Sequence, residues 1–405
     1  MKKINFSEWG INSPVYWGTL VLLAAIAGIG GLSALYMEHN GHWVTGMSNQ
    51  VVWGVPHIFA IFLIVAASGA LNVASIASVF GKTPYKPLAR LSAVFAVTLL
   101  IGGLLVLVLD LGRPDRLILA MTTYNFKSIF AWNIMLYSGF MVVVIIYLFT
   151  MMERKAQSYN KAAGTFAFIW RLTLTTGTGS IFGFIVARQA FDAAIMAPMF
   201  VIMSFSFGLA CFLLLLMYVY RADNRELGDS IVFRLKNLLG IFVAAVFYFT
   251  LAYHLTNLYG TENHSLEHFL LLDGGVYTSV FWIGQILLGT LVPLGILYHP
   301  ALGKMRNWIA IACGLVLVGA FSQLYVIIIG GQAFPMQMFP GKTIIESGFY
   351  DGVDGLGAFY APTLPEILLG VGGIAVAILM VLVVVRMLPI LPISLADKDV
   401  DPHAG

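Results

Sequence analysis

Apolar residues in this chain gather into ten long runs separated by short polar connections. A helix of about 20 apolar residues crosses the hydrocarbon core of a bilayer, and each run reaches that length. The pattern predicts an all-α polytopic membrane protein with ten transmembrane helices, at Val15–Met37, Val55–Phe80, Leu91–Asp110, Ser128–Met152, Thr165–Ala187, Ala193–Tyr220, Leu238–Gly260, Val276–Tyr298, Trp308–Gly330 and Pro365–Val385.

The composition supports this class. Hydrophobic residues make up 60% of the 405 residues, charged residues only 10%, and the mean hydropathy is +0.90. A soluble domain does not have this composition. The net charge of +3 comes from Lys and Arg residues that flank the apolar runs. We therefore expect the lipid bilayer as a partner and no nucleic acid.

The positions of Lys and Arg predict which side of the membrane each loop occupies. If the N-terminus is cytoplasmic, seventeen of the 22 Lys and Arg residues fall on the inner side, and five fall on the outer side: Arg113, Arg116, Lys127, Arg188 and Lys342. This bias agrees with the positive-inside rule. We therefore place both termini in the cytoplasm.

A weak internal repeat predicts how the helices are grouped. The second span opens with Val55-Pro56 and the sixth with Ala197-Pro198, and the two prolines are 142 residues apart. This spacing favours two tandem four-helix bundles, spans 2–5 and 6–9, with one flanking helix at each end. The expected segments are 1–45 for the first helix and outer loop, 46–190 and 191–330 for the two bundles, and 331–405 for a long outer loop, the last helix and a cytoplasmic tail.

Ionisable and polar side chains converge on the outer ends of several spans. They include His57, Asp110, Arg113, Tyr124, Asn133 and Tyr137 in the first half, and His254 and Gln285 in the second. A quinone headgroup needs hydrogen-bond partners for its two oxygens and a group that exchanges protons. A histidine with a nearby carboxylate supplies both. The alternatives are a helix stop for Asp110 with Arg113 and helix–helix hydrogen bonds for the amides.

The outer loops suggest a docking surface. The connection Gly331–Leu364 is the longest and has no helical period, and the 260–273 loop contains Glu262, Glu267 and Asp273. Long loops in compact proteins are usually functional. Two interpretations remain open, a lid over the helix ends and a surface for an extracytoplasmic subunit.

Two other classes of membrane protein compete with a quinone-reactive subunit. A haem b cytochrome would use His57 and His254 as axial ligands, but no histidine lies in the inner half of any span. A secondary transporter usually has a buried charge at mid-membrane, whereas the basic Arg171 can reach the inner interface. Cys211 and Cys313 lie in apolar runs and provide no cluster-binding set. We therefore expect no haem and no iron–sulfur cluster in this chain.

Three segments resemble the NrfD/PsrC family of polysulfide-reductase-like membrane subunits. They are the Asp-Leu-Gly-Arg-Pro-Asp-Arg stretch at Asp110–Arg116, the Trp53–Pro56 segment, and the Tyr124–Trp132 segment. The layout looks most like the ten-helix branch that includes HybB, the alternative complex III subunits and DsrP. The resemblance implies a haem-free quinone-reactive anchor in the cytoplasmic membrane of a bacterium. It also implies an extracytoplasmic ferredoxin-like iron–sulfur subunit and further redox subunits as partners.

These observations lead to one hypothesis. The protein exchanges electrons between menaquinone or ubiquinone and an external iron–sulfur subunit, in anaerobic respiration with a link to sulfur metabolism. His57 and Asp110 are the proposed catalytic pair. Arg113 orders the loop or keeps Asp110 charged, and Tyr124, Asn133 and Tyr137 line the quinone pocket. His254 and Gln285 are second-bundle candidates. We expect the chain alone to be inactive, because it has no electron carrier of its own.

Overall fold

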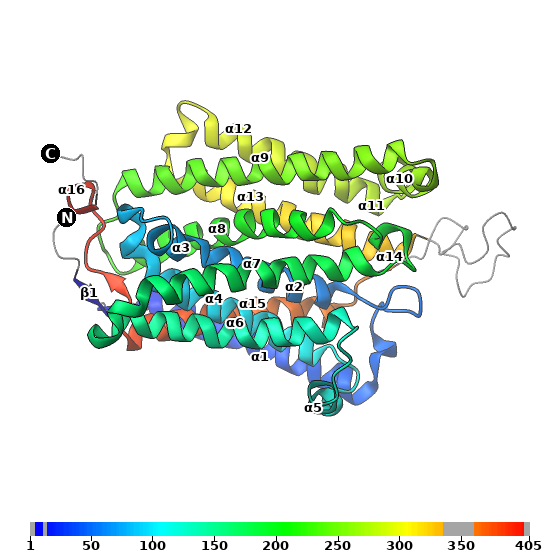
Figure 1. Cartoon of the computed structure of the whole chain (residues 1–405), viewed down its shortest axis with the longest axis horizontal. Coiled ribbons are helices and arrows are strands. Elements are labelled where there is room, and N and C mark those ends of the chain that lie inside the picture. The colour runs from blue at the N-terminus through cyan, green and yellow to red at the C-terminus, as the bar shows by residue number, and fades with distance from the viewer. Residues whose placement is uncertain (1–4, 11–13, 335–359, 401–405) are drawn as a thin grey trace, which may run out of the picture.

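The computed structural model describes residues 5–10, 14–334 and 360–400. Figure 1 shows a bundle of long helices whose axes are nearly parallel to one another. Nine helices within these residues are long and apolar enough to cross a membrane. They are α1 (Pro14–Asn40), α2–α3 (Val55–Ser78), α4 with its preceding turn (Thr83–Leu109), α6 (Ile129–Met152), α8 (Met196–Ala222), α9 (Asp229–Tyr259), α11–α12 (Val276–Tyr298), α13–α14 (Arg306–Ala333) and α15 (Leu364–Met387). The predicted all-α polytopic class is confirmed.

The fifth predicted span, Thr165–Ala187, corresponds to α7 (Asn160–Phe184), a helix of 25 residues that packs against α6 and α8. It is less apolar than the other nine, because its sequence includes Arg171 and the Thr-Leu-Thr-Thr-Gly-Thr-Gly-Ser run at 173–180. Four of the five hydroxyl groups in this run bond back to the helix itself; the Thr175 Oγ1, for example, donates to the carbonyl oxygen of Arg171 at 2.9 Å. Small and hydroxyl-bearing residues are common where transmembrane helices pack closely.

Shorter elements complete the structure. The short helices are α5 (Leu117–Thr122), α10 (His264–His268) and α16 (Asp397–Val400), and the π-helical segments are η7 (Phe269–Asp273), η8 (Val280–Leu291) and η10 (Val326–Gly330). Strands β1 (Phe6–Ser7) and β2 (Leu391–Pro392) pair antiparallel, with Phe6 opposite Pro392. This pair lies at the end of the molecule where the described part of the chain begins and ends (Figure 1). We call that the inner end, following the side assigned from Lys and Arg, and the opposite end the outer end.

The two flanking helices pack against each other. Helix α1 lies along α15, which in turn packs against α4 and α2. Gly30 and Gly372 allow this contact, because a Cβ atom added to Gly30 would lie 2.8 Å from the Cα of Gly372. Both flanking helices therefore lie beside the first half of the chain.

Helices α2 and α8 cross at two glycines near the centre of the molecule. A Cβ atom on Gly69 would lie 1.6 Å from the carbonyl oxygen of Ser204, and one on Gly208 would lie 2.2 Å from the amide nitrogen of Ala70. Only glycine permits backbones to approach this closely. Gly69 lies 13 residues after Pro56, and Gly208 lies 10 residues after Pro198.

Arg171 does not reach the inner interface, contrary to expectation. Its side chain is completely buried, and its Nη2 donates to Oδ1 of Asn72 at 2.8 Å. The guanidinium carbon lies 4.8 and 4.9 Å from the ring centres of Phe168 and Phe205. The expectation failed because Asn72 begins α3 directly after a break in the second span. The break turns a polar group toward the arginine, and the two rings add cation–π contacts.

Candidate functional site

His57 and Asp110 meet at the outer end of the first half of the chain. His57 lies in the first turn of α2, and Asp110 directly follows the last residue of α4. The His57 Nδ1 is 2.7 Å from the Asp110 Oδ2, and the two side chains are 18% and 1% exposed. The structure therefore brings together the two residues proposed as the catalytic pair. It does so because α2 and α4 are adjacent antiparallel helices whose outer ends coincide.

The His57 Nδ1 and the Asp110 Oδ2 lie at ion-pair distance but without the alignment of a linear hydrogen bond. Neither carboxylate oxygen of Asp110 accepts a hydrogen bond from the described residues. The His57 Nδ1 has no hydrogen-bond partner among them either. The main-chain oxygen of Asp110 lies 3.1 Å from the His42 Nε2. A buried carboxylate without donors requires a positive partner or a proton. The imidazole of His57 is placed to supply either.

An aromatic wall borders the pair. The indole of Trp53 is stacked near the imidazole of His57, with ring centres 6.0 Å apart and planes at 29°. Phe130, Phe182 and Phe191 pack around the same indole, with ring centres 5.8–6.1 Å from it. The wall therefore combines residues of α6, α7 and the following loop around a residue that precedes α2.

Gln332 of α14 holds Trp53 in place. The Gln332 Oε1 accepts hydrogen bonds from the backbone amides of Val52 and Trp53, each at 3.0 Å. Its Nε2 donates to the carbonyl oxygens of Trp53 and Ile328 at 3.0 and 2.8 Å. Sequence reasoning placed this residue in a surface loop, but Gln332 is completely buried. No local pattern signals a contact between residues 279 positions apart.

The contacts of Arg113 and Tyr124 are with residues outside the pair. The Arg113 Nε is 3.2 Å from the Asp115 Oδ1, and both side chains are well exposed. This hydrogen bond raises the pKa of Arg113 and lowers the pKa of Asp115. Arg113 therefore pairs with Asp115 and not with Asp110. Tyr124 is stacked near Phe126 with ring centres 6.0 Å apart.

Asn133 and Tyr137 are buried at the contact between α6 and α7. The Asn133 Nδ2 donates to the carbonyl oxygens of Ile129 and Gly177 at 2.9 and 3.0 Å, and the Tyr137 hydroxyl lies 3.1 Å from the Thr178 Oγ1. Both residues thus join two helices. The Asn133 Oδ1 is buried and has no partner among the described residues.

A second histidine–carboxylate pair lies at the outer end of the second half. The His254 Nδ1 is 2.6 Å from the Glu267 Oε2, and the Asn257 Nδ2 donates to the Glu267 Oε1 at 2.8 Å. Glu267 was expected on an acidic outer surface, but its side chain is completely buried. The reason is that α10 folds back onto α9 and turns this carboxylate inward. Of the predicted docking loops, residues 335–359 lie outside the described part of the chain.

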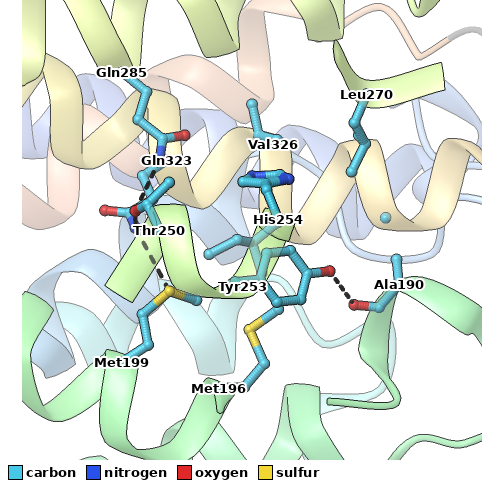
Figure 2. Close-up of a pocket in the computed structure, with 12 residues that line it drawn as sticks. Ala190, Met196, Met199, Thr250, Tyr253, His254, Leu270, Gln285, Gln323 and Val326 are labelled. Atoms are coloured by element: carbon cyan, nitrogen blue, oxygen red, sulfur yellow. Dashed lines mark hydrogen bonds between the residues drawn. The ribbon is translucent and has the colours of Figure 1, made fainter. Parts of the chain in front are cut away.

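His254 and Gln285, the two second-bundle candidates, line one small pocket of about 20 Å³, which has room for a water-sized molecule (Figure 2). Amide groups from two helices point to Thr250, since the Nε2 atoms of Gln285 and Gln323 lie 3.5 and 3.3 Å from its Oγ1. Apolar side chains, among them Met196, Met199, Leu270 and Val326, form much of the remaining wall.

Residues 43–336 match the family model described as polysulphide reductase, NrfD. The chain belongs to the NrfD family. This family match spans the second to the ninth predicted helix and confirms the resemblance noted from the Asp110–Arg116 motif. It contains both histidine–carboxylate pairs and the pocket.

Named relatives of this NrfD-family protein include subunits of several redox enzymes. The sequence is 28% identical to the Hdr-like menaquinol oxidoreductase integral membrane subunit of Archaeoglobus fulgidus, over 98% of this chain and 99% of the relative. It is 24% identical to one of the selenate reductase subunits of Mesobacillus selenatarsenatis, over 91% and 93%. It is 22% identical to one of the polysulfide reductase polypeptides of Wolinella succinogenes, over 71% and 96%. In length it therefore matches the longer members.

Proposed function

We propose that this chain is the quinone-reactive membrane anchor of a respiratory redox complex and passes electrons between the quinone pool and an iron–sulfur subunit on the outer side. The observation that carries the proposal is the buried His57–Asp110 pair beside the Trp53 indole. It combines a proton-exchanging group, a carboxylate and a flat apolar surface in one place. The chain belongs to the NrfD family, and one of its relatives is named as a menaquinol oxidoreductase subunit, so we interpret this combination as a quinone site.

The geometry suggests how the pair acts on a quinol. The Nδ1 of His57 faces Asp110, so Nε2 is the ring nitrogen left to accept a proton from a quinol hydroxyl. The resulting imidazolium is stabilised by the adjacent carboxylate, whose oxygens accept no hydrogen bond from the described residues. Oxidation of a quinol releases two electrons and two protons. The electrons pass to the iron–sulfur partner, and at least one proton leaves through His57.

The relatives guide the choice of substrate. The name of the Archaeoglobus relative specifies menaquinol, and that of the Wolinella relative specifies polysulfide. We therefore favour menaquinol over ubiquinol as the substrate and a sulfur compound or similar acceptor for the complete complex. In such a complex, this chain carries out the oxidation of quinol at the membrane.

The proposed topology has ten spans, with α7 as the fifth and both termini in the cytoplasm. The described ends of the chain lie together at the inner end, where β1 pairs with β2. Both histidine–carboxylate pairs then face the outer side of the membrane. This orientation places the quinone chemistry next to an extracytoplasmic partner in the cytoplasmic membrane.

The test is electron transfer in the intact complex, with a soluble menaquinol analogue as donor and bleaching of the partner clusters as readout. We expect His57→Ala to slow cluster reduction by about 10²-fold, as is typical when a proton-transfer group is lost. Asp115→Asn is the matched control, because it removes a carboxylate from the same connection at an exposed position. Near-normal turnover in assembled His57→Ala complex would refute the proposal.

A further inference from the structure

We propose that Tyr360, just before α15, and Glu366, in the first turn of α15, are positioning residues for the His57–Asp110 pair. They hold the N-terminus of α2, the helix that carries His57, and they act through that helix. The proposal rests on the quinol chemistry proposed above and names two residues on which this chemistry depends. Both residues lie outside the part of the chain that matches the family model, residues 43–336.

Glu366 is a completely buried carboxylate that joins several segments at the outer end. Its Oε2 accepts hydrogen bonds from the Gly46 amide at 2.9 Å and from the amide and hydroxyl of Thr363 at 2.8 and 2.9 Å. Its Oε1 accepts a hydrogen bond from the Tyr360 hydroxyl at 2.7 Å. A capping box at the start of α15 needs only Thr363. The contacts with Gly46 and Tyr360 therefore go beyond the capping of this helix.

The hydroxyl of Tyr360 caps α2. It accepts a hydrogen bond from the backbone amide of Val55 at 2.8 Å and donates its own hydrogen to Glu366. The first amides of a helix have no partner within the helix, and Gly54, which precedes Val55, has no side chain that could accept from them. The cap of α2 therefore comes from a residue 305 positions away, and Glu366 sets the direction of its hydroxyl.

Gly54 lets the backbone approach these two side chains. A Cβ atom on Gly54 would lie 2.5 Å from the Glu366 Oε1 and 2.7 Å from the Tyr360 hydroxyl oxygen. The backbone at Gly54 is extended, with φ of −87°, which other residues also adopt. Glycine is therefore needed here for space and not for conformation. This accounts for the glycine in the Trp53–Pro56 segment.

The cap lies within one turn of His57. The amide of His57 donates to the carbonyl oxygen of Gly54 at 3.2 Å, so a shift at Gly54 reaches His57. Helix α15 also packs against both α2 and α4, the helices at whose outer ends His57 and Asp110 lie. The His57 Nδ1 and the Asp110 Oδ2 are only 2.7 Å apart, so a small movement of the first turn of α2 changes their contact. Tyr360 and Glu366 therefore determine where the imidazole lies relative to its carboxylate.

Quinol-dependent cluster reduction in the intact complex tests the role, with Tyr360→Phe as the variant. This change keeps the ring and removes only the hydroxyl, so the Val55 amide and Glu366 each lose a partner. We expect kcat per assembled complex to fall by about 10- to 10²-fold, as when a reacting group is misplaced by about 1 Å. We expect little change in KM, because the lost interaction acts on the reaction step and not on quinol binding.

Tyr16→Phe is the matched control. Tyr16 is also buried, and its hydroxyl donates to the carbonyl oxygen of Leu382 on α15 at 3.3 Å, near the inner end. This variant should leave kcat unchanged. Gly54→Ala is a second variant that places a methyl group against the same two oxygens, and it should lower kcat as Tyr360→Phe does. Tyr360→Phe combined with His57→Ala should be no slower than His57→Ala alone, because both changes affect one step.

The outcomes separate this proposal from the proposed function. Normal kcat in assembled Tyr360→Phe complex, with His57→Ala slowed, overturns the positioning role and leaves the function standing. A loss in Tyr360→Phe that recurs in full on top of His57→Ala shows a general structural effect and also overturns the role. If Tyr360→Phe complex does not assemble, Gly54→Ala decides by the same criteria. Near-normal turnover in His57→Ala overturns the function itself and the positioning role with it.

Discussion

Gln332 and Trp53 are joined through both backbone groups of the tryptophan, although 279 residues separate them. The glutamine belongs to the helix that ends the ninth predicted span, and the tryptophan precedes the second. The indole beside His57 is therefore positioned from the other half of the chain. Arg188 strengthens this link, since its guanidinium donates to the carbonyl oxygens of Gln332 and Gln50 at 3.0 and 2.6 Å.

Replacing Gln332 by leucine should disturb the site around His57 and Asp110, although Gln332 is not part of that pair. The change removes the acceptor of the part-buried backbone amides of Val52 and Trp53, and each lost hydrogen bond costs about 0.5–1.5 kcal/mol. We expect a lower melting temperature and a higher KM for quinol, because the indole is no longer fixed. Thermal unfolding in detergent and quinol kinetics measure both. An unchanged melting temperature and an unchanged KM in Gln332→Leu would contradict the role assigned to Oε1.

The double variant of His57 and Asp110 should show that the two residues act as a unit. We expect His57→Ala and Asp110→Asn each to slow quinol oxidation by about 10²-fold, and the double variant to be little slower than either. Groups that work together give such non-additive losses. Stopped-flow cluster reduction in assembled complex is the measurement. Losses that multiply in the double variant would instead show that the residues act separately.

The two carboxylates of the outer connection should differ in their effect on pH dependence. Arg113 lowers the pKa of Asp115, so this group stays ionised at every pH above its ordinary range. Any stability from the Arg113 contact is present above that range and is lost only as the pH falls through the lowered pKa. Asp115→Asn should therefore leave the pH profile of quinol turnover between about pH 5 and 8 unchanged. Asp110→Asn should alter it, and a profile shifted equally by both variants would count against a special role for Asp110.

The crossing of α2 and α8 should tolerate no side chain at its centre. Gly69→Ala places a methyl group 1.6 Å from the Ser204 carbonyl oxygen, so the helices must separate. We expect a marked drop in folded protein recovered from the membrane, measured by fluorescence size-exclusion chromatography. Gly314→Ala is the control, because a Cβ atom there meets nothing within 4 Å. A normal yield of Gly69→Ala would mean that the helices can shift at little cost.

Much of the framework follows from the sequence because hydropathy is local. Each span is marked by its own residues, and two adjacent spans with a short inner connection must bring His57 and Asp110 to the same end. The sequence could not show that Glu267 turns inward, because an acidic residue in a polar segment has no pattern that distinguishes a surface from a buried position. Arg171 and Gln332 were misplaced for the same reason. Their partners, Asn72 and Trp53, are distant in sequence and become neighbours only when the helices pack.

The π-helical segments have a consequence for how this chain is aligned with other members of its family. A π turn closes its hydrogen bonds across one residue more than an α turn, so it corresponds to an inserted residue in the middle of a helix. Removing one residue from η8 would let the segment wind as an α-helix and rotate Gln285 relative to Pro293 on the same span. A one-residue gap at this place in an alignment therefore marks a change from π-helical to α-helical geometry. We expect such a gap to separate family members that form this pocket from members that do not.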